Sequence, residues 1–176
     1  MADTGAPWNI PFVEPTDLVR DYPAADEAQA LAVAAGLSAA GQVRQIVRAT
    51  DGTNRLTSSS SFVDAQISVT ITPTSANSNL LIIWSYLGNT TGGSDRRLET
   101  QITDASDTPL EGAESTLLRN NTALVTAMQT VVGFVAAGSV STQTFKTRFR
   151  NQGASGNVTL DNARLTGQLY AIEVAP

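Results

Sequence analysis

The amino-acid sequence predicts a mainly β protein: an antiparallel β-sandwich, jelly-roll-like, preceded by an extended N-terminal arm and one short α-helix. Three observations predict this fold. The first segment combines aromatic residues with regularly spaced prolines, and the second is dense in alanine. From Gln42 onward, apolar residues alternate with Ser, Thr and Asn, the two-residue period of half-buried strands. The expected boundaries are 1–21 for the arm, 22–41 for the helix and 42–176 for the sandwich.

The arm is expected to be extended. Pro7, Pro11 and Pro15 each fix their own φ and push the preceding residue toward extended geometry. The arm is nevertheless too apolar for a free tail. Either it packs as a flap on its own β domain, or it docks in a groove of another protein, with the aromatic residues as anchors because interface energy concentrates in buried aromatics. The expected docking residues are Trp8, Ile10, Phe12, Val13, Leu18 and Val19.

A helix is expected to follow from Tyr22. Pro23 suits a first helical turn, Asp26 and Glu27 favour the positive end of the helix dipole, and Gly41 is a typical helix stop. Alone, a helix of this length is marginal in water. Because alanine lets helix axes approach closely, we expect an association seam between copies, although packing on the chain's own β domain is the alternative. The expected seam residues are Ala28, Leu31, Ala35 and Leu37.

The rest of the chain is expected to form short strands over 42–50, 53–57, 62–72, 80–88, 95–103, 122–135, 142–151, 156–164 and 166–175. Ile67, Val69 and Ile71 share one face of their strand, as do Tyr170, Ile172 and Val174 of the last one. The segment 80–87 is apolar on both faces, which predicts a central strand covered on each side. The acidic segment 104–114 is interpreted as a polar loop.

The composition argues against an enzyme. The chain has no cysteine and no histidine, which excludes disulfides and thiol nucleophiles and removes the commonest general base. A net charge of −5 with only 11 basic residues disfavours nucleic acid as a partner. No apolar run is long enough to span a bilayer, and Met1–Gly5 lacks the features of a signal peptide. We therefore expect no catalytic residue, no cofactor, no metal site, no nucleic-acid partner, no membrane insertion and folding in a cytoplasm.

Two polar clusters, one acidic and one basic, are candidates for ion binding, catalysis or a subunit contact. The loop with Asp104, Asp107, Glu111 and Glu114 offers oxygen ligands for calcium, but its spacing is not that of an EF-hand and Asp is an ordinary turn former. The sequence leaves ion binding there open. The same carboxylates resemble a glycosidase pair only in residue type, since no aromatic sugar platform accompanies them. A basic stripe is read as a solvated sheet face or as a partner for acidic groups of a neighbouring subunit; it comprises Lys146, Arg148, Arg150 and Arg164.

The arm and helix also carry a resemblance. Pro7-Trp8-Asn9-Ile10-Pro11, then Thr16-Asp17-Leu18-Val19-Arg20-Asp21, then an alanine-rich helix, is similar to the N-terminus of many bacteriophage virion proteins labelled tail fibre or minor tail protein. The C-terminal part resembles a phage β domain through 61–64, 68–73, 145–150 and 166–174. The resemblance implies a role in the virion and supplies no functional residue.

These observations together predict a non-enzymatic virion structural protein, made in the host cytoplasm and docked by its arm on another virion protein of the tail, baseplate or major capsid. The resemblance favours a minor tail or short tail-fibre protein, a homotrimer whose loops contact the host surface. The alternative is a capsid decoration protein, of the cement or head-fibre type, because a helix of roughly 25 Å gives little reach. A polysaccharide depolymerase is the remote alternative.

Overall fold

The computed structural model describes residues 2–3, 11–12, 22–39, 42–90, 96–118, 125–153 and 156–176. The chain divides into two compact units, one of residues 1–42 with 175–176 and one of residues 43–174. The first holds the N-terminal elements and the second holds the whole β domain.

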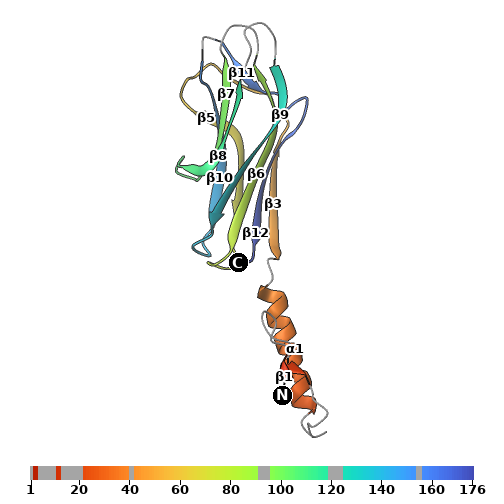
Figure 1. The fold of residues 1–176 in the computed structure, drawn as a ribbon. Coiled ribbons are helices and arrows are strands. Elements are labelled where there is room, and N and C mark those ends of the chain that lie inside the picture. Colours follow the sequence, from red (N-terminus) through yellow and green to blue (C-terminus); the bar gives the residue numbers. More distant parts are fainter. Residues whose placement is uncertain are drawn as a thin grey trace. The chain divides into compact units, whose positions relative to one another are not determined.

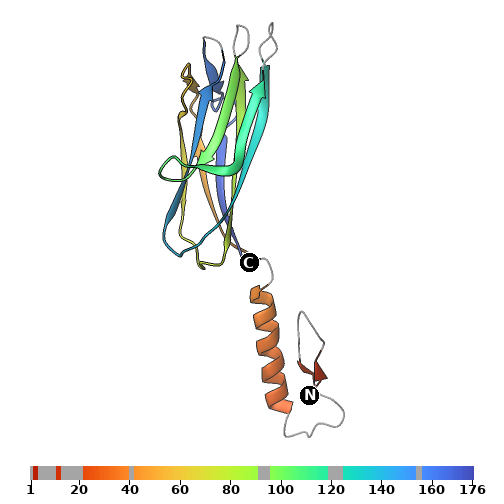
Figure 2. The same cartoon turned by 60° about the vertical axis from the view of Figure 1, so that its left-hand side comes forward.

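In the first unit, two short strands precede one helix (Figure 2). Strand β1 (Ala2–Asp3) pairs antiparallel with β2 (Pro11–Phe12), and Cα atoms of β2 come within 8 Å of Cα atoms of α1 (Tyr22–Ala39). The 18-residue helix places Pro23 in its first turn, where a missing backbone N–H costs no intrahelical hydrogen bond. The expected helix is therefore present, and the described part of the arm is extended.

The second unit consists of strands (Figure 1). They are β3 (Val43–Asp51), β4 (Arg55–Thr57), β5 (Val63–Ile71), β6 (Asn79–Thr90), β7 (Arg97–Thr103), β8 (Pro109–Leu118), β9 (Val125–Ala136), β10 (Gln143–Asn151), β11 (Val158–Leu160) and β12 (Gly167–Val174).

The strands form two antiparallel sheets. In sheet I, β6 pairs with β9 along one edge and with β12 and then β11 along the other, and these two pair in turn with β3 and β4. Sheet II has the order β5-β10-β7-β8. If β3/β4 and β11/β12 are each counted as one interrupted strand, the sheets read 1-8-3-6 and 2-7-4-5 in chain order. That is the strand arrangement of a jelly roll, so the expected mainly β sandwich is confirmed.

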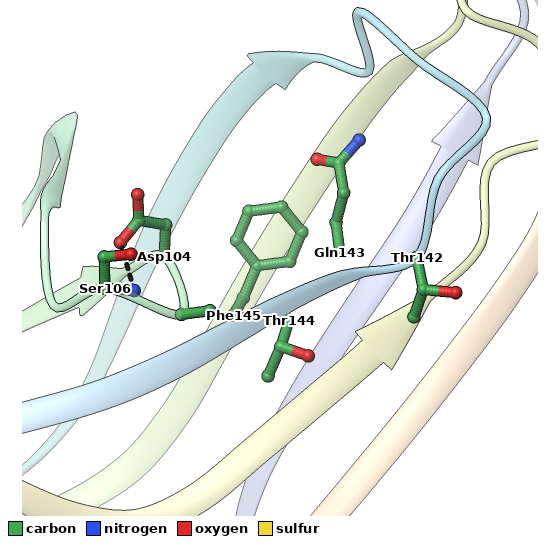
Figure 3. Close-up of a pocket in the computed structure, with 7 residues that line it drawn as sticks. Asp104, Ser106, Thr142, Gln143, Thr144 and Phe145 are labelled. Atoms are coloured by element: carbon green, nitrogen blue, oxygen red, sulfur yellow. Dashed lines mark hydrogen bonds between the residues drawn. The ribbon is translucent and has the colours of Figure 1, made fainter.

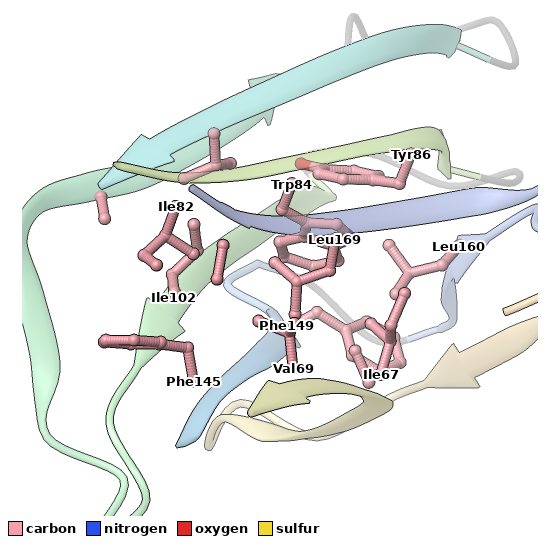
Figure 4. Packing of buried hydrophobic residues seen from close by; sticks show 14 of the residues in the cluster. Ile67, Val69, Ile82, Trp84, Tyr86, Ile102, Phe145, Phe149, Leu160 and Leu169 are labelled. Carbon is pink, nitrogen blue, oxygen red and sulfur yellow. The ribbon is translucent and has the colours of Figure 1, made fainter. Parts of the chain in front are cut away.

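The core lies between the two sheets and follows the predicted alternation (Figure 4). Ile67, Val69 and Ile71 of β5 are all buried, and so are Phe145 and Phe149 of β10. From sheet I, the rings of Trp84 and Tyr86 pack with their centroids 4.3 Å apart. The Tyr86 hydroxyl and Thr100 Oγ1 are 2.7 Å apart in a hydrogen bond, which satisfies the one polar atom of this buried ring. Burial raises the pKa of Tyr86 to about 12.

The segment 104–114 is not a loop throughout, which corrects the sequence interpretation. Residues 104–108 form a tight turn, in which the Asp104 carboxylate accepts hydrogen bonds from the backbone N–H groups of Ser106 and Thr108. From Pro109 the chain enters β8, which pairs with β7 and buries Ala113. The apolar side chains of β8 decide its structure, and its exposed carboxylates, Glu111 and Glu114, lie on the solvent side.

Strand β8 also brings the two sheets together at one side of the sandwich. A Cβ added at Gly133 of β9 would lie 3.0 Å from Leu110 Cδ1 and 3.2 Å from Ala113 Cβ, so a larger residue there would require these neighbours to shift. Beside it, Ser115 Oγ donates a hydrogen bond to Gln129 Oε1 across 3.0 Å. The contact between β8 and β9 therefore rests on side chains, whereas each strand pairs through its backbone within its own sheet.

The strand expected over 156–164 is shorter than predicted. It ends at Leu160, and the backbone N–H groups of Arg164 and Leu165 then donate to the Asp161 carbonyl in a turn. Asn162 is buried in this turn and donates a hydrogen bond to Asp51 Oδ2 across 3.2 Å. The turn interrupts the strand, so that β11 pairs with β4 while β12 pairs with β3.

Candidate interaction surfaces

The outer face of sheet I, opposite the core, is apolar across β3, β12, β6 and β9. The strand registers align Ile46 of β3, Ile172 of β12, Leu81 of β6 and Phe134 of β9 in one row. The next row on the same face contains Arg48, Tyr170, Ile83 and Val132. These two rows are called the apolar face below.

The side chains of the apolar face are accessible to solvent. On the two outer strands, Ile46 is 60% exposed, Phe134 is 63% exposed and Val132 is 49% exposed. On the inner strands, Leu81, Ile83, Tyr170 and Ile172 are half-buried by their neighbours. The one charged member, Arg48, lies at the edge with its guanidinium carbon 5.7 Å from the Tyr170 ring centroid. Contiguous exposed apolar side chains of this kind make the apolar face a candidate interaction surface.

The sequence shows that both faces of segment 80–87 are apolar, but it predicts a different cover for the outer face. The segment 80–87 was expected to be central and covered on both sides. In the structure β6 is central, but only Leu80, Ile82, Trp84 and Tyr86 point into the core. Likewise, Tyr170, Ile172 and Val174 are in phase, but they lie on the outer face, while Leu169 and Ala171 fill the core. Apolar residues on both faces of an antiparallel strand were the signal that a second surface needs a cover.

The outer face of sheet II is polar and charged. Lys146 Nζ lies 2.5 Å from one carboxylate oxygen of Asp107, and Arg148 Nη1 lies 2.7 Å from the other. Arg150 Nη2 lies 2.6 Å from Glu99 Oε2, and its guanidinium carbon lies 4.4 Å from the Phe62 ring centroid. The hydrogen bond from Lys146 lowers the pKa of Asp107, with Arg148 adding to the effect. The basic stripe of β10 is thus a solvated face with intramolecular partners, and Arg164 lies apart from it, in the turn after β11.

An open pocket of about 330 Å³ lies between the Asp104 turn and β10 (Figure 3). Its walls are Asp104, Ala105 and Ser106 on one side and Thr142, Gln143, Thr144 and Phe145 on the other. The Asp104 carboxylate is occupied by backbone N–H groups of its own turn. None of these side chains has a buried polar atom without a hydrogen-bond partner, so the pocket shows no chemical group prepared for a ligand.

Two buried carboxylates have structural partners. Glu173 accepts hydrogen bonds from Gln45 Nε2 at 2.6 Å and from the Thr74 N–H and hydroxyl at 2.9 and 2.8 Å. Burial alone would raise the pKa of Glu173, but these donors and the nearby Ser78 hydroxyl lower it from 4.5 to about 2. The Ser78 hydroxyl is close to the carboxylate but does not have direct hydrogen-bond geometry. This carboxylate fastens the segment between β5 and β6 to the end of sheet I.

Asp51 is the second buried carboxylate. Its two oxygens accept hydrogen bonds from Arg55 Nε and Nη2 at 2.9 and 3.2 Å and from the Thr53 N–H. Burial opposes ionisation, but these bonds and that from Asn162 lower its pKa below the usual value. With the bond from Asn162, each Asp51 oxygen accepts two hydrogen bonds, and Asp51 fixes the turn between β3 and β4.

The sequence-predicted contact residues fall in the first unit. Of the docking residues, Trp8, Ile10, Val13, Leu18 and Val19 lie outside the described residues, and Phe12 is placed as part of the β2 backbone. Of the seam residues, Ala28 is half-buried, Leu31 is 64% exposed and Ala35 is exposed. Leu37 is part of α1, but its side chain lies outside the described part.

No protein-family model matches the chain, and no curated protein matches it. Within the described ranges, His, Cys, Asp and Glu form no group of three that could hold a metal ion. Among the described residues, no helix combines the length and the apolar character needed to cross a membrane.

Proposed function

We propose that this chain is a non-enzymatic structural protein of a bacteriophage particle, made in the host cytoplasm and assembled as a homotrimer. Its N-terminal arm docks on another virion protein, and its jelly roll is displayed. The proposal places it in the tail, as a minor tail or short tail-fibre protein whose loops contact the host surface. This proposal rests on the resemblance of the arm and helix to phage virion proteins and on the form of the helix.

The observation that carries the proposal is the exposure of α1. Side chains from Asp26 to Gly36 are all exposed or half-exposed, including Leu31 at 64% and Val33 at 37%. The β domain has a complete core of its own and does not need this helix. Since an isolated helix of 18 residues is marginal in water, it gains stability by packing against other chains. A helix with this exposure supports assembly as the chain's role.

The charged groups of the β domain support a structural role as well. Asp51, Asp107 and Glu173 are each held by neighbouring side chains or backbone groups of the same chain. An enzyme's acid or base must instead reach a reacting group in an accessible site. The Asp104 carboxylate, one of those considered for a polysaccharide depolymerase, is likewise held by backbone N–H groups of its own turn.

A capsid decoration protein is the second candidate, and the length of the helix favours it. Eighteen residues at about 1.5 Å each give roughly 27 Å, which extends the jelly roll only a short way from its attachment point. A tail fibre generally needs reach, whereas a cement protein needs only to bridge neighbouring capsid subunits.

Electron microscopy of particles carrying a label on this chain tests the proposal and separates its two forms. Label at the tail tip supports the tail protein, and label over the head supports the decoration protein. Copy number per particle gives an independent answer, because a head coat needs many more copies than a tail tip. A chain missing from purified particles would contradict both forms.

Deletion of residues 2–20 tests the docking arm. We expect the shortened chain to remain folded, because the β domain contains its own core, but to be lost from purified particles. Trp8→Ala combined with Phe12→Ala is expected to cause most of the same loss. If the shortened chain binds particles at the wild-type copy number, the anchor lies in the β domain.

A further inference from the structure

We propose that the apolar face of sheet I is a contact between copies of this chain, covered in the assembled protein by a second copy. This inference goes beyond the proposed function, because it locates a subunit interface on the β domain itself. It does not depend on whether the particle is a phage or on the helix being a seam.

The first argument is area. Neighbouring strands lie about 4.8 Å apart and residues rise about 3.3 Å along a strand, so two rows across four strands take up about four residues of each strand and cover roughly 250 Å² before side-chain relief is added. A standard interface buries about 800 Å² per partner. The apolar face is therefore enough for the centre of a subunit interface, and the surface around it must supply the rest.

The second argument is the arrangement of polar residues around it. On one side, the next row consists of Thr50, Gln168, Ser85 and Thr130, and on the other it consists of Val43, Val174, Asn79 and Ala136. The apolar face is therefore bordered by polar residues on one side, and an apolar centre with a polar border is the usual anatomy of a protein–protein interface. Aromatic side chains are enriched at such centres, and this one contains Phe134 and Tyr170.

The third argument is charge, and it selects the partner. Strands β6 and β9 contain no charged residue, and the one charged residue of β12, Glu173, is buried. Only the edge strand β3 brings charge to this side of the sheet, as Arg48 beside Tyr170 and as exposed Arg44. Both arginines lie at the edge, so the centre of the apolar face carries no charge that would select an acidic or basic partner. The neutral, apolar surface of a second copy is the occupant that fits.

Phe134→Lys tests the inference in the full-length chain. Phe134 is already 63% exposed on the outer face of β9, so the substitution leaves the core of each copy intact. The matched control is Thr70→Lys, which places the same charge at an exposed position on the outer face of sheet II. Light scattering should give a multiple of 18.4 kDa for the wild type and for the control, and a mass shifted toward 18.4 kDa for Phe134→Lys at the same concentration.

Cysteine labelling gives a second readout that does not depend on disrupting the assembly. The chain has no native cysteine, so Phe134→Cys and Thr70→Cys each introduce a single thiol. We expect the thiol at position 134 to react with a maleimide at least tenfold more slowly than the thiol at position 70 in the assembled protein. In denaturant, where no interface exists, the two thiols should react at similar rates.

Three results would overturn the inference: a monomeric wild-type chain at high concentration, an unchanged mass for Phe134→Lys, or equal labelling of the two thiols in the assembled protein. If Leu31→Asp gives monomers and Phe134→Lys does not, the helix alone joins the copies and the apolar face is not the interface. All of these measurements use purified protein, so their outcome is independent of where the chain lies on a particle.

Discussion

The two outer faces of the sandwich cover the same core but have opposite chemistry. On sheet II, the outward side chains of β10 are Lys146, Arg148 and Arg150, and each lies within 3 Å of a carboxylate of the same chain. On sheet I, the outward side chains include Ile46, Ile83 and Phe134, which the described residues leave exposed or half-exposed. A surface that only faced water would gain nothing from these apolar residues, and this difference supports our proposal that the apolar face is covered by a second copy.

The largest effect on this comparison is expected from charging both edges of the apolar face. Ile46→Lys combined with Phe134→Lys changes the two ends of one row, on β3 and β9. Each substitution removes about 1 kcal/mol or more of the free energy gained by burying that side chain on association, so the dissociation constant should rise at least about fivefold per substitution and about 25-fold for both. Concentration-dependent light scattering or analytical ultracentrifugation measures this change.

The matched control for the double variant is Thr70→Lys with Thr144→Lys on sheet II. These threonines pair with each other across β5 and β10, and their hydroxyls form one hydrogen bond at 3.0 Å near the surface. The control should change the dissociation constant little. Equal loss of association in both double variants would mean that added positive charge, and not the apolar face, controls assembly.

How much of this molecule could be predicted from its sequence depends on whether the signal is local. The alternation in β5 correctly placed Ile67, Val69 and Ile71 on one face, which is the core face, because period two is enforced within each strand. The strand β8 was missed because Pro109, Gly112 and two glutamates resemble a loop. Its backbone pairing with β7 and the burial of Ala113 are contacts with distant segments, which no local pattern reports.

The apolar face was missed for a different reason. Sequence periodicity shows that both faces of 80–87 are apolar, but it does not distinguish a cover within the chain from a cover by another chain. The same limit applies to Glu173, whose partners Gln45 and Thr74 are far away in sequence. The arm and seam residues came from composition and resemblance, and they stay predictions.

An intermediate effect is expected from lowering the pH, which should reduce the stability of the fold without changing the association of copies. Because hydrogen bonds lower the pKa of Glu173 to about 2, its ionised form stabilises the folded state above 4.5, its unfolded value. That contribution is lost as the pH falls from about 4.5 toward about 2. The urea midpoint should therefore fall over this range, with smaller contributions from Asp51 and Asp107, whose pKa values are also lowered.

Glu173→Gln isolates the contribution of Glu173. The variant should be less stable than the wild type at neutral pH, and its urea midpoint should depend less on pH below 4.5. The apolar face contains no carboxylate, so the dissociation constant should stay constant from neutral pH down to the start of this range. An assembly that dissociates at mildly acidic pH, while the fold is intact, would mean that carboxylates take part in the subunit contact.

The smallest effect is expected from the charged face. Asp107→Asn removes the negative partner of Lys146 and Arg148 but keeps a residue type that tolerates the positive φ of 67° at this position. Asp107 is 44% exposed, so solvent and salt screen both ion pairs. The urea midpoint should fall slightly at low salt, the difference should disappear at high salt, and the dissociation constant should not change. If Asp107→Asn instead alters the mass of the assembly, the basic stripe contacts a neighbouring copy, and the contrast between a solvated and a protein-covered face does not hold.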